Sequence, residues 1–392
     1  MNKLIIGKGK SNTKKLYLLF FPFLLPVVDV GVGTILTFLV MLLTFGGVVF
    51  LQKKSTLNYF SVVCFCFSII CICISLIMQN SSFYYYDDIS NNYVFRISML
   101  FFVFLVSSSY LNNMYSNRKD AFFDFSKLLF ILIVASIVFE YSIRAIDFKP
   151  ILYLYKARQD LGGIDSVHYN RFSGFTSFPG DMAALIALSF VCVQVFLRSK
   201  IMLLILFGAI ILTQSKAGLI LLLIFYIARS ATKFSVKNII LVLLSTVLSL
   251  YIIQALELEY YIRFLENLEH YAFESKRAQE MLLFLKASSI ESLFGNFSLN
   301  GMYFESEIFS TLNRNGIIGS LWLFILFVSC VFIYFTRKVS CEKDVVLFLL
   351  VFIGFYCFMS AGFSRSKIGI FYVFFIAIFT IPNFDNKNKR QV

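Results

Sequence analysis

The feature that most constrains this chain is a succession of long apolar segments that contain almost no charge. Residues 16–50, for example, include no Lys or Arg and a single acidic residue, Asp29. A helix needs about 20 apolar residues to cross the hydrocarbon core of a bilayer, so this stretch is long enough for two crossings. Pro22, Pro26 and Asp29 interrupt it and divide it into two predicted membrane spans.

Applied to the whole chain, the same criterion predicts about twelve transmembrane helices. Their approximate ranges are 16–29, 32–51, 57–79, 97–112, 128–143, 181–197, 201–213, 217–228, 238–256, 316–336, 345–361 and 368–382. The composition agrees, because 59% of the 392 residues are hydrophobic and only 15% are charged, whereas a soluble domain has about 25% charged residues. The expected fold class is therefore all-α, a polytopic integral membrane protein with a single transmembrane domain over residues 1–392.

The positively charged residues predict the orientation in the membrane. If the N-terminus is cytoplasmic, every predicted inner segment contains Lys or Arg, and the short outer segments near Asp29 and at 80–92 contain none. This is the positive-inside pattern, so both termini are expected in the cytoplasm. The formal net charge of +13 therefore reports topology first, and we expect no nucleic-acid partner.

Two predicted outer loops, 144–180 and 257–315, are much longer than the others. Long loops between packed helices are uncommon and are usually functional. Both histidines, His168 and His270, lie in these loops, as does much of the outward positive charge. Because Arg can bind phosphate through two parallel hydrogen bonds, this charge suggests a substrate with an anionic head group. The alternative is that these side chains are simply solvated or bind lipid phosphates.

The first loop ends in the segment 171–181, Arg-Phe-Ser-Gly-Phe-Thr-Ser-Phe-Pro-Gly-Asp. Pro179 and Gly180 are typical of a turn and of the first turn of a helix. This places Arg171 just outside the membrane, above the start of a helix. Aromatic rings are favoured at the membrane interface, so we interpret the aromatic residues of this segment as interface anchors. They are Phe172, Phe175 and Phe178.

A polar hairpin tip, Thr213-Gln-Ser-Lys-Ala-Gly218, separates two apolar runs that are short for membrane spans. Either polar residues extend these helices, or the helices form a hairpin with its tip near the middle of the membrane. Lys216 is energetically costly at that depth unless it is paired or lines a wet cavity. The alternative is that its side chain extends to the membrane surface.

The second loop begins with an acidic helical stretch and continues into the apolar residues 281–285, a pattern expected of a helix on the membrane surface. If the end of this loop is also helical, a carboxylate, two hydroxyls and a guanidinium share one face at the mouth of the next span. The alternative is a helix entry stabilised by a Glu–Arg pair. The residues on this face are Glu307, Ser310, Thr311 and Arg314.

These segments resemble motifs of the bacterial O-antigen polymerase (Wzy-type) and O-antigen ligase superfamily. The resemblance covers about 170–335. It is carried by Arg171-x-x-Gly174 with Pro179, by Thr213 to Gly218, by Arg277 and Leu293-Phe-Gly295, and by Glu305-Ser-Glu307 and Asn315-Gly-Ile-Ile-Gly319.

The chain departs from the family pattern at two places. Ser215-Lys216-Ala217 stands where the family usually has Ser-Arg-Gly, so the charge is kept but the two-pronged guanidinium is lost. Glu305-Ser-Glu307 stands where ligases typically carry His-Asn. The second departure favours the polymerase over the ligase.

The resemblance implies a GT-C-like glycosyltransferase of the bacterial inner membrane with a periplasmic active site and periplasmic loops at 144–180 and 257–315. It would transfer the growing glycan from undecaprenyl diphosphate onto the next lipid-linked repeat unit. Membrane lipid and a chain-length regulator protein are the further expected partners. Positive charge would stabilise the diphosphate leaving group. The residues expected to bind it are Arg171, Lys216, Arg277 and Arg365.

A general base would deprotonate the attacking sugar hydroxyl. Glu307 and Glu305 are the candidates, with His168 as a further one, and we expect Tyr303 and Arg314 to contact other parts of the substrate. We expect no cofactor and no metal requirement. An O-antigen ligase and a capsule or exopolysaccharide polymerase are close alternatives. A repeat-unit flippase, from another functional class, should instead carry charges inside its spans.

Overall fold

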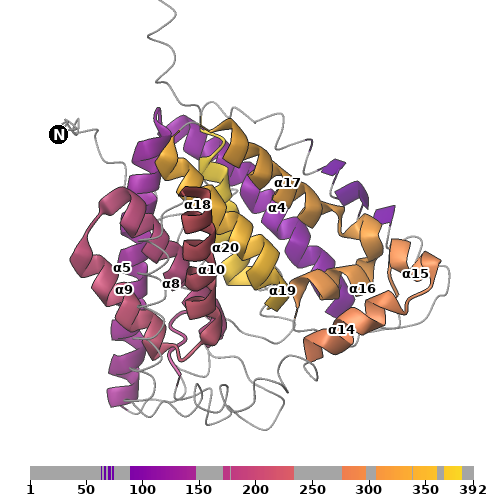
Figure 1. The fold of residues 1–392 in the computed structure, drawn as a ribbon, viewed down its shortest axis with the longest axis horizontal. Coiled ribbons are helices and arrows are strands. Elements are labelled where there is room, and N and C mark those ends of the chain that lie inside the picture. The colour runs from indigo at the N-terminus through magenta and orange to yellow at the C-terminus, as the bar shows by residue number, and fades with distance from the viewer. Residues whose placement is uncertain are drawn as a thin grey trace, which may run out of the picture.

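The computed structural model describes residues 63, 66–67, 69–71, 73–74, 89–146, 171–176, 178–233, 276–296, 306–337, 339–359 and 366–381. Within these ranges the regular structure is helical and contains no β-strand, which confirms the all-α prediction for this part of the chain. The helices, with π-helical segments written η, are shown in Figure 1. They are α4 (Ile89–Met114), α5 (Arg118–Ala145), α8 (Pro179–Cys192), η1 (Val193–Leu197), α9 (Lys200–Leu212), α10 (Lys216–Lys233), α14 (Lys276–Leu285), α15 (Ser289–Phe294), α16 (Glu307–Gly319), α17 (Leu321–Thr336), α18 (Ser340–Val351), η3 (Phe352–Tyr356), α19 (Cys357–Met359) and α20 (Ser366–Ile378).

Two of the described helices are long and apolar enough to cross a membrane. They are α5 and the continuous helix formed by α8 and η1, and the bent pair of α16 and α17 is a third candidate. Shorter apolar helices cover Leu100–Met114, Lys200–Leu212, Ala217–Thr232 and Ile368–Ile378. Eight of the predicted spans fall largely on described helices. They are 97–112, 128–143, 181–197, 201–213, 217–228, 316–336, 345–361 and 368–382.

The remaining predicted spans lie wholly or mostly outside the described residues. The total of about twelve therefore stays a prediction. Of the two short helices, α10 continues through polar residues to Lys233, whereas α9 has only 13 residues, and both alternatives for the pair stay predictions.

The chain is helical from Glu307 and bends by 93° between α16 and α17, close to the predicted start of the span at 316. Gly316 has φ +65° and ψ −174°, a conformation that is essentially restricted to glycine. A Cβ atom at this position would lie 2.3 Å from the carbonyl oxygen of Leu293 and 2.5 Å from the nitrogen of Gly295. Only glycine therefore allows α16 to pack this closely on α15.

The central helix of the described bundle is α8, which contacts α5, α9, α10, α18 and α20 (Figure 1). Its side chains from Met182 to Leu188 have no exposed surface. A helix that is apolar on all sides is expected in the interior. The approach of α10 is especially close, because a Cβ atom on Gly218 would lie only 2.7 Å from that of Ala183.

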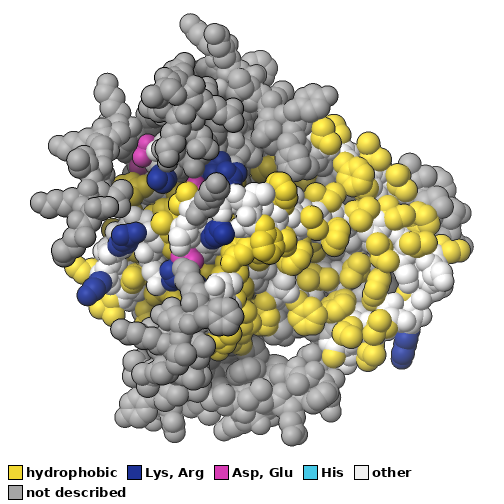
Figure 2. All heavy atoms as spheres, turned by 45° about the horizontal axis from the view of Figure 1, so that its top comes forward, with side chains coloured by type: hydrophobic (Ala, Val, Ile, Leu, Met, Phe, Trp, Pro, Cys, Tyr) yellow, Lys and Arg dark blue, Asp and Glu magenta, His cyan; other side chains and the backbone are white. Residues whose placement is uncertain are grey.

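Large hydrophobic side chains also cover the outside of the molecule. Phe324, Phe332 and Phe335 of α17 are largely exposed, as are Ile201 and Leu204 of α9. Figure 2 shows hydrophobic side chains over a broad part of one face, with few charged side chains among them. Extended exposed apolar surface of this kind marks contact with a membrane or with another protein. This surface is compatible with an integral membrane protein.

One end of the bundle is joined by a buried and a partly buried ion pair. Arg118 of α5 contacts Glu342 of α18 at 3.0 Å and also donates a hydrogen bond to the carbonyl oxygen of Ile381. Arg229 of α10 pairs with Asp344 of α18 at 2.7 Å. In the predicted topology this is the cytoplasmic end. Its arginines, which the sequence marks only as topology signals, therefore also connect helices.

Candidate functional site

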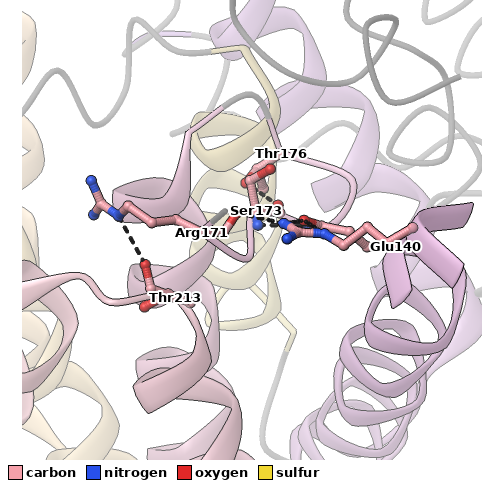
Figure 3. Close-up of polar contacts among 7 residues, drawn as sticks. Glu140, Arg171, Ser173, Thr176 and Thr213 are labelled. Atoms are coloured by element: carbon pink, nitrogen blue, oxygen red, sulfur yellow. Dashed lines mark hydrogen bonds and ion pairs between the residues drawn. The ribbon is translucent and has the colours of Figure 1, made fainter. Parts of the chain in front are cut away.

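A buried carboxylate holds the segment that precedes α8. One oxygen of Glu140, near the end of α5, accepts hydrogen bonds from the backbone nitrogens of Ser173 (3.0 Å) and Gly174 (2.7 Å). The other oxygen accepts hydrogen bonds from Arg144, one turn later. Arg144 in turn donates to the carbonyl oxygen of Arg171 at 3.1 Å. Figure 3 shows Glu140 and this segment facing each other.

Arg171 connects the same segment to the turn between α9 and α10. Its Nε donates to the carbonyl oxygen of Thr213 at 3.2 Å (Figure 3). Its Nη2 donates to the carbonyl oxygen of Gln214 at 3.0 Å. The backbone nitrogen of Phe172 also donates to the carbonyl oxygen of Leu212 at 3.1 Å. The last carbonyls of a helix lack partners within the helix and attract cations. The buried guanidinium of Arg171 therefore caps the carboxyl end of α9.

Two aromatic residues of this segment are not the interface anchors that the sequence predicts. Phe172 is fully buried and stacks on Tyr141 with ring centroids 6.3 Å apart, and Phe175 is buried against Phe139 at 5.0 Å. The segment folds back onto α5, so these rings face protein. Lipid and protein interior are both apolar, and the sequence pattern is therefore the same for either environment.

The amino-terminal ends of α8 and α10 lie next to each other. α8 begins at Pro179, as predicted, and α10 begins at Lys216. A Cβ atom on Gly180 would lie 3.7 Å from the hydroxyl oxygen of Ser215 and 3.8 Å from that of Tyr356. The polar tip before α10, the start of α8 and a tyrosine from η3 therefore meet at this end of the bundle.

Tyr356 and Cys357 link this region to the start of α16. The hydroxyl of Tyr356 donates to the carboxylate of Asp181 at 3.1 Å, and both side chains are buried. The carbonyl oxygen of Cys357 accepts a hydrogen bond from the hydroxyl of Ser306 at 3.3 Å. Ser306 is the N-cap of α16, whose first residue is Glu307. Segments that are far apart in the sequence are thus joined through η3 and α19.

The predicted helix at the end of the second loop is present as α16. Its polar residues Glu307, Ser310, Thr311 and Arg314 are all buried, and Glu307 has no exposed surface. A carboxylate in the first turn of a helix is stabilised by the helix dipole. Because Glu307 is enclosed, a substrate would reach it only after a local opening of the surrounding structure.

Glu280 of α14 is a second buried carboxylate that organises the site. It accepts a hydrogen bond from the backbone nitrogen of Ser306 at 3.1 Å, and its own carbonyl oxygen accepts one from the side chain of Asn313 at 3.0 Å. The backbone nitrogen of Asn296 donates to the carbonyl oxygen of Asn313 at 2.9 Å. These bonds tie α14 and the end of α15 to α16, and Arg277 lies on α14 one turn before Glu280.

The outward sides of α14 and α15 are apolar. A capping box starts α15, in which hydrogen bonds from the backbone nitrogen and hydroxyl of Ser288 lower the pKa of Glu291. An apolar outward surface beside a buried Glu280 is what a helix at a membrane surface would present. Its exposed residues are Met281, Leu282, Leu283, Leu285, Ile290 and Leu293.

Several predicted site residues cannot be placed. His168, Tyr303, Glu305 and Arg365 lie outside the described residues, as do the side chains of Lys216 and Arg277. The structure places the side chains of Arg171, Glu307 and Arg314. In the part of the chain that the structure describes, no group of three or more His, Cys, Asp and Glu is arranged to hold a metal ion.

Sequence reasoning missed three acidic residues that organise this end of the bundle, Glu140, Asp181 and Glu280. A signal for two of them exists in the sequence, because Glu140 and Asp181 adjoin long apolar runs. An ionisable residue within a membrane span is costly unless a specific partner satisfies it. Neither a scan against protein-family models nor a search of curated proteins finds a match for this sequence.

Proposed function

We propose that this chain is an O-antigen polymerase, a glycosyltransferase of the bacterial inner membrane that extends a surface polysaccharide at the periplasmic face. The observation that carries the proposal is the meeting of three separate polar segments at one end of an apolar helical bundle. They are the segment held by Glu140, the turn before α10 and the start of α16. This end lies opposite the Arg118–Glu342 ion pair, and is the outer end in the predicted topology.

The reaction would move the growing glycan from its lipid carrier to the next lipid-linked repeat unit. A sugar hydroxyl of the incoming unit attacks the anomeric carbon, the bond from that carbon to the diphosphate oxygen breaks, and undecaprenyl diphosphate leaves. The negative charge on the leaving group is stabilised by positive side chains in a site that excludes water. Arg171 is assigned this role because its guanidinium lies at the carbonyl of Gln214, two residues before Lys216. Since Arg171 is buried, the diphosphate would reach it only after the same kind of local opening that Glu307 requires.

In this proposal Arg277 and Arg365 complete the group of cations around the diphosphate. Glu307, with Glu305 and His168 as the other candidates, accepts the proton of the attacking hydroxyl. Arg314 and Tyr303 contact other parts of the substrate. Cationic side chains stabilise the leaving group without a metal ion, so a chelator should leave elongation by the reconstituted protein intact. Loss of elongation in the chelator would contradict the proposed metal independence.

The first test is genetic. A strain that lacks the gene should attach a single repeat unit to its lipid core, and the wild-type gene should restore the ladder of long chains on a polysaccharide gel. Arg171→Ala and Glu307→Gln should both give the single-repeat pattern at normal protein levels. Full ladders from Arg171→Ala would refute the phosphate-binding role of this residue. Complete absence of attached polysaccharide in the deletion strain would indicate a ligase or a flippase instead.

A further inference from the structure

Glu140 is placed to control the position of Arg171. Its carboxylate is buried, and its hydrogen-bond partners are the backbone nitrogens of Ser173 and Gly174 and the guanidinium of Arg144. Arg144 continues the chain of contacts to the carbonyl oxygen of Arg171. Figure 3 shows Glu140 on α5 and Thr213 on the opposite side, with Arg171 and Ser173 between them.

The segment has little freedom to move once it is bound to Glu140. Gly174 has φ +56°, and a Cβ atom there would lie 2.8 Å from the hydroxyl oxygen of Ser136. Thr176 closes the turn by donating to the carbonyl oxygens of Ser173 (2.6 Å) and Phe178 (3.0 Å). Glu140 is therefore the acceptor that holds a tight backbone turn against α5.

We propose that Glu140 is a positioning residue for the polymerase reaction. It acts through Arg144 and the amides of Ser173 and Gly174, which hold the backbone of Arg171 so that its guanidinium stays on the turn before α10. Glu140 itself does not contact the substrate. This inference rests on the proposed function, because it takes Arg171 to be the group that binds the diphosphate.

The test compares Glu140→Ala with a matched control, Glu342→Ala. Both residues are buried glutamates of α-helices that are paired with an arginine, but Glu342 lies at the opposite end of the bundle. Amide hydrogen exchange of the purified full chain reports the local effect. A buried donor that loses its acceptor costs enough to speed local exchange by about 10- to 100-fold. This acceleration is expected at Ser173 and Gly174 in Glu140→Ala and not in Glu342→Ala.

The second readout is elongation per folded protein, measured with lipid-linked repeat units in vesicles. We expect Glu140→Ala to lose at least about 10-fold in elongation rate. Glu342→Ala should keep the wild-type rate, even if its melting temperature falls by as much as that of Glu140→Ala. Glu140→Gln keeps an acceptor oxygen for an amide and should recover part of the activity. If Glu140→Ala does not fold, Glu140→Gln and Arg144→Met carry the test, and each should slow elongation.

The outcomes separate this inference from the proposed function. If Arg171→Ala abolishes elongation and the folded Glu140 and Arg144 variants keep the wild-type rate, the positioning role is refuted and the proposed function survives. If Arg171→Ala also elongates normally, the proposed diphosphate site is wrong. Unchanged hydrogen exchange at Ser173 and Gly174 in Glu140→Ala would overturn the geometric basis of the inference.

Discussion

The bend between α16 and α17 depends on Gly316, and its replacement by alanine should be strongly destabilising. The φ and ψ of Gly316 fall in a region that costs another residue about 1–3 kcal/mol. In addition, the new Cβ atom would lie 2.3 Å from the carbonyl oxygen of Leu293, which is a backbone atom that cannot rotate away. Relieving such an overlap costs about 1–3 kcal/mol more. We therefore expect Gly316→Ala to lose about 2–6 kcal/mol.

The sole tryptophan of the chain reports directly on this bend. Trp322 follows the bend in α17, is buried, and packs edge-on against Phe101 with ring centroids 6.0 Å apart. Thermal unfolding followed by its fluorescence should show a melting temperature about 2–7 °C below wild type for Gly316→Ala. The emission of the folded variant should shift to longer wavelength, because the displaced indole becomes more exposed.

The matched control is Gly208→Ala in α9, since a Cβ atom on Gly208 would meet nothing within 4 Å. This variant should keep the wild-type emission and should melt at or slightly above the wild-type temperature, because alanine has the higher helix propensity. The reasoning is refuted if Gly316→Ala unfolds within about 1 °C of wild type with the same emission spectrum. The tight approach of α15 to the bend would then not be a property of the folded protein.

Three further substitutions test other contacts of the bundle. Gly218→Ala should lower the melting temperature, because the new methyl group would overlap the side chain of Ala183, and an unchanged value would contradict the close packing of α8 and α10. Arg118→Met should cost about 3–5 kcal/mol in urea or thermal unfolding by leaving the buried Glu342 without its 3.0 Å partner, and a loss below about 1 kcal/mol would argue against the pair. Ser306→Ala removes the N-cap of α16 and should cost about 1 kcal/mol in the same assay. Because the amide of Phe309 donates to the Ser306 hydroxyl, its hydrogen exchange should become faster, and normal protection of Phe309 would exclude the cap.

Much of the helical framework could be predicted from the sequence because membrane helices are uncharged runs with polar ends. The start of α8 at Pro179 and the helical nature of the segment around Glu307 follow from the same local rules. The bend at Gly316 could not be predicted, since its conformation is set by the approach of Leu293 from another helix. Local sequence carries no information about such a contact.

The candidate site was predictable as a set of segments but not as a geometry. In a soluble protein, polarity separates buried from exposed positions, whereas here the exposed Phe324 and the buried Phe172 have the same apolar character. Sequence alone therefore does not distinguish an interface anchor from a buried ring at Phe172. The role of Glu140 could not be predicted, because its partners are the amides of Ser173 and Gly174, which are more than 30 residues away and reach it only in the folded chain.

The central claim is tested most directly by reconstituting the purified chain in vesicles with undecaprenyl-diphosphate-linked repeat units taken from a strain that lacks the gene. We predict glycans of two or more repeats on a single carrier, together with release of free undecaprenyl diphosphate. Arg171→Ala should yield neither product at the same amount of folded protein. If folded wild-type protein leaves the repeat units unjoined, the chain is not the polymerase that we propose.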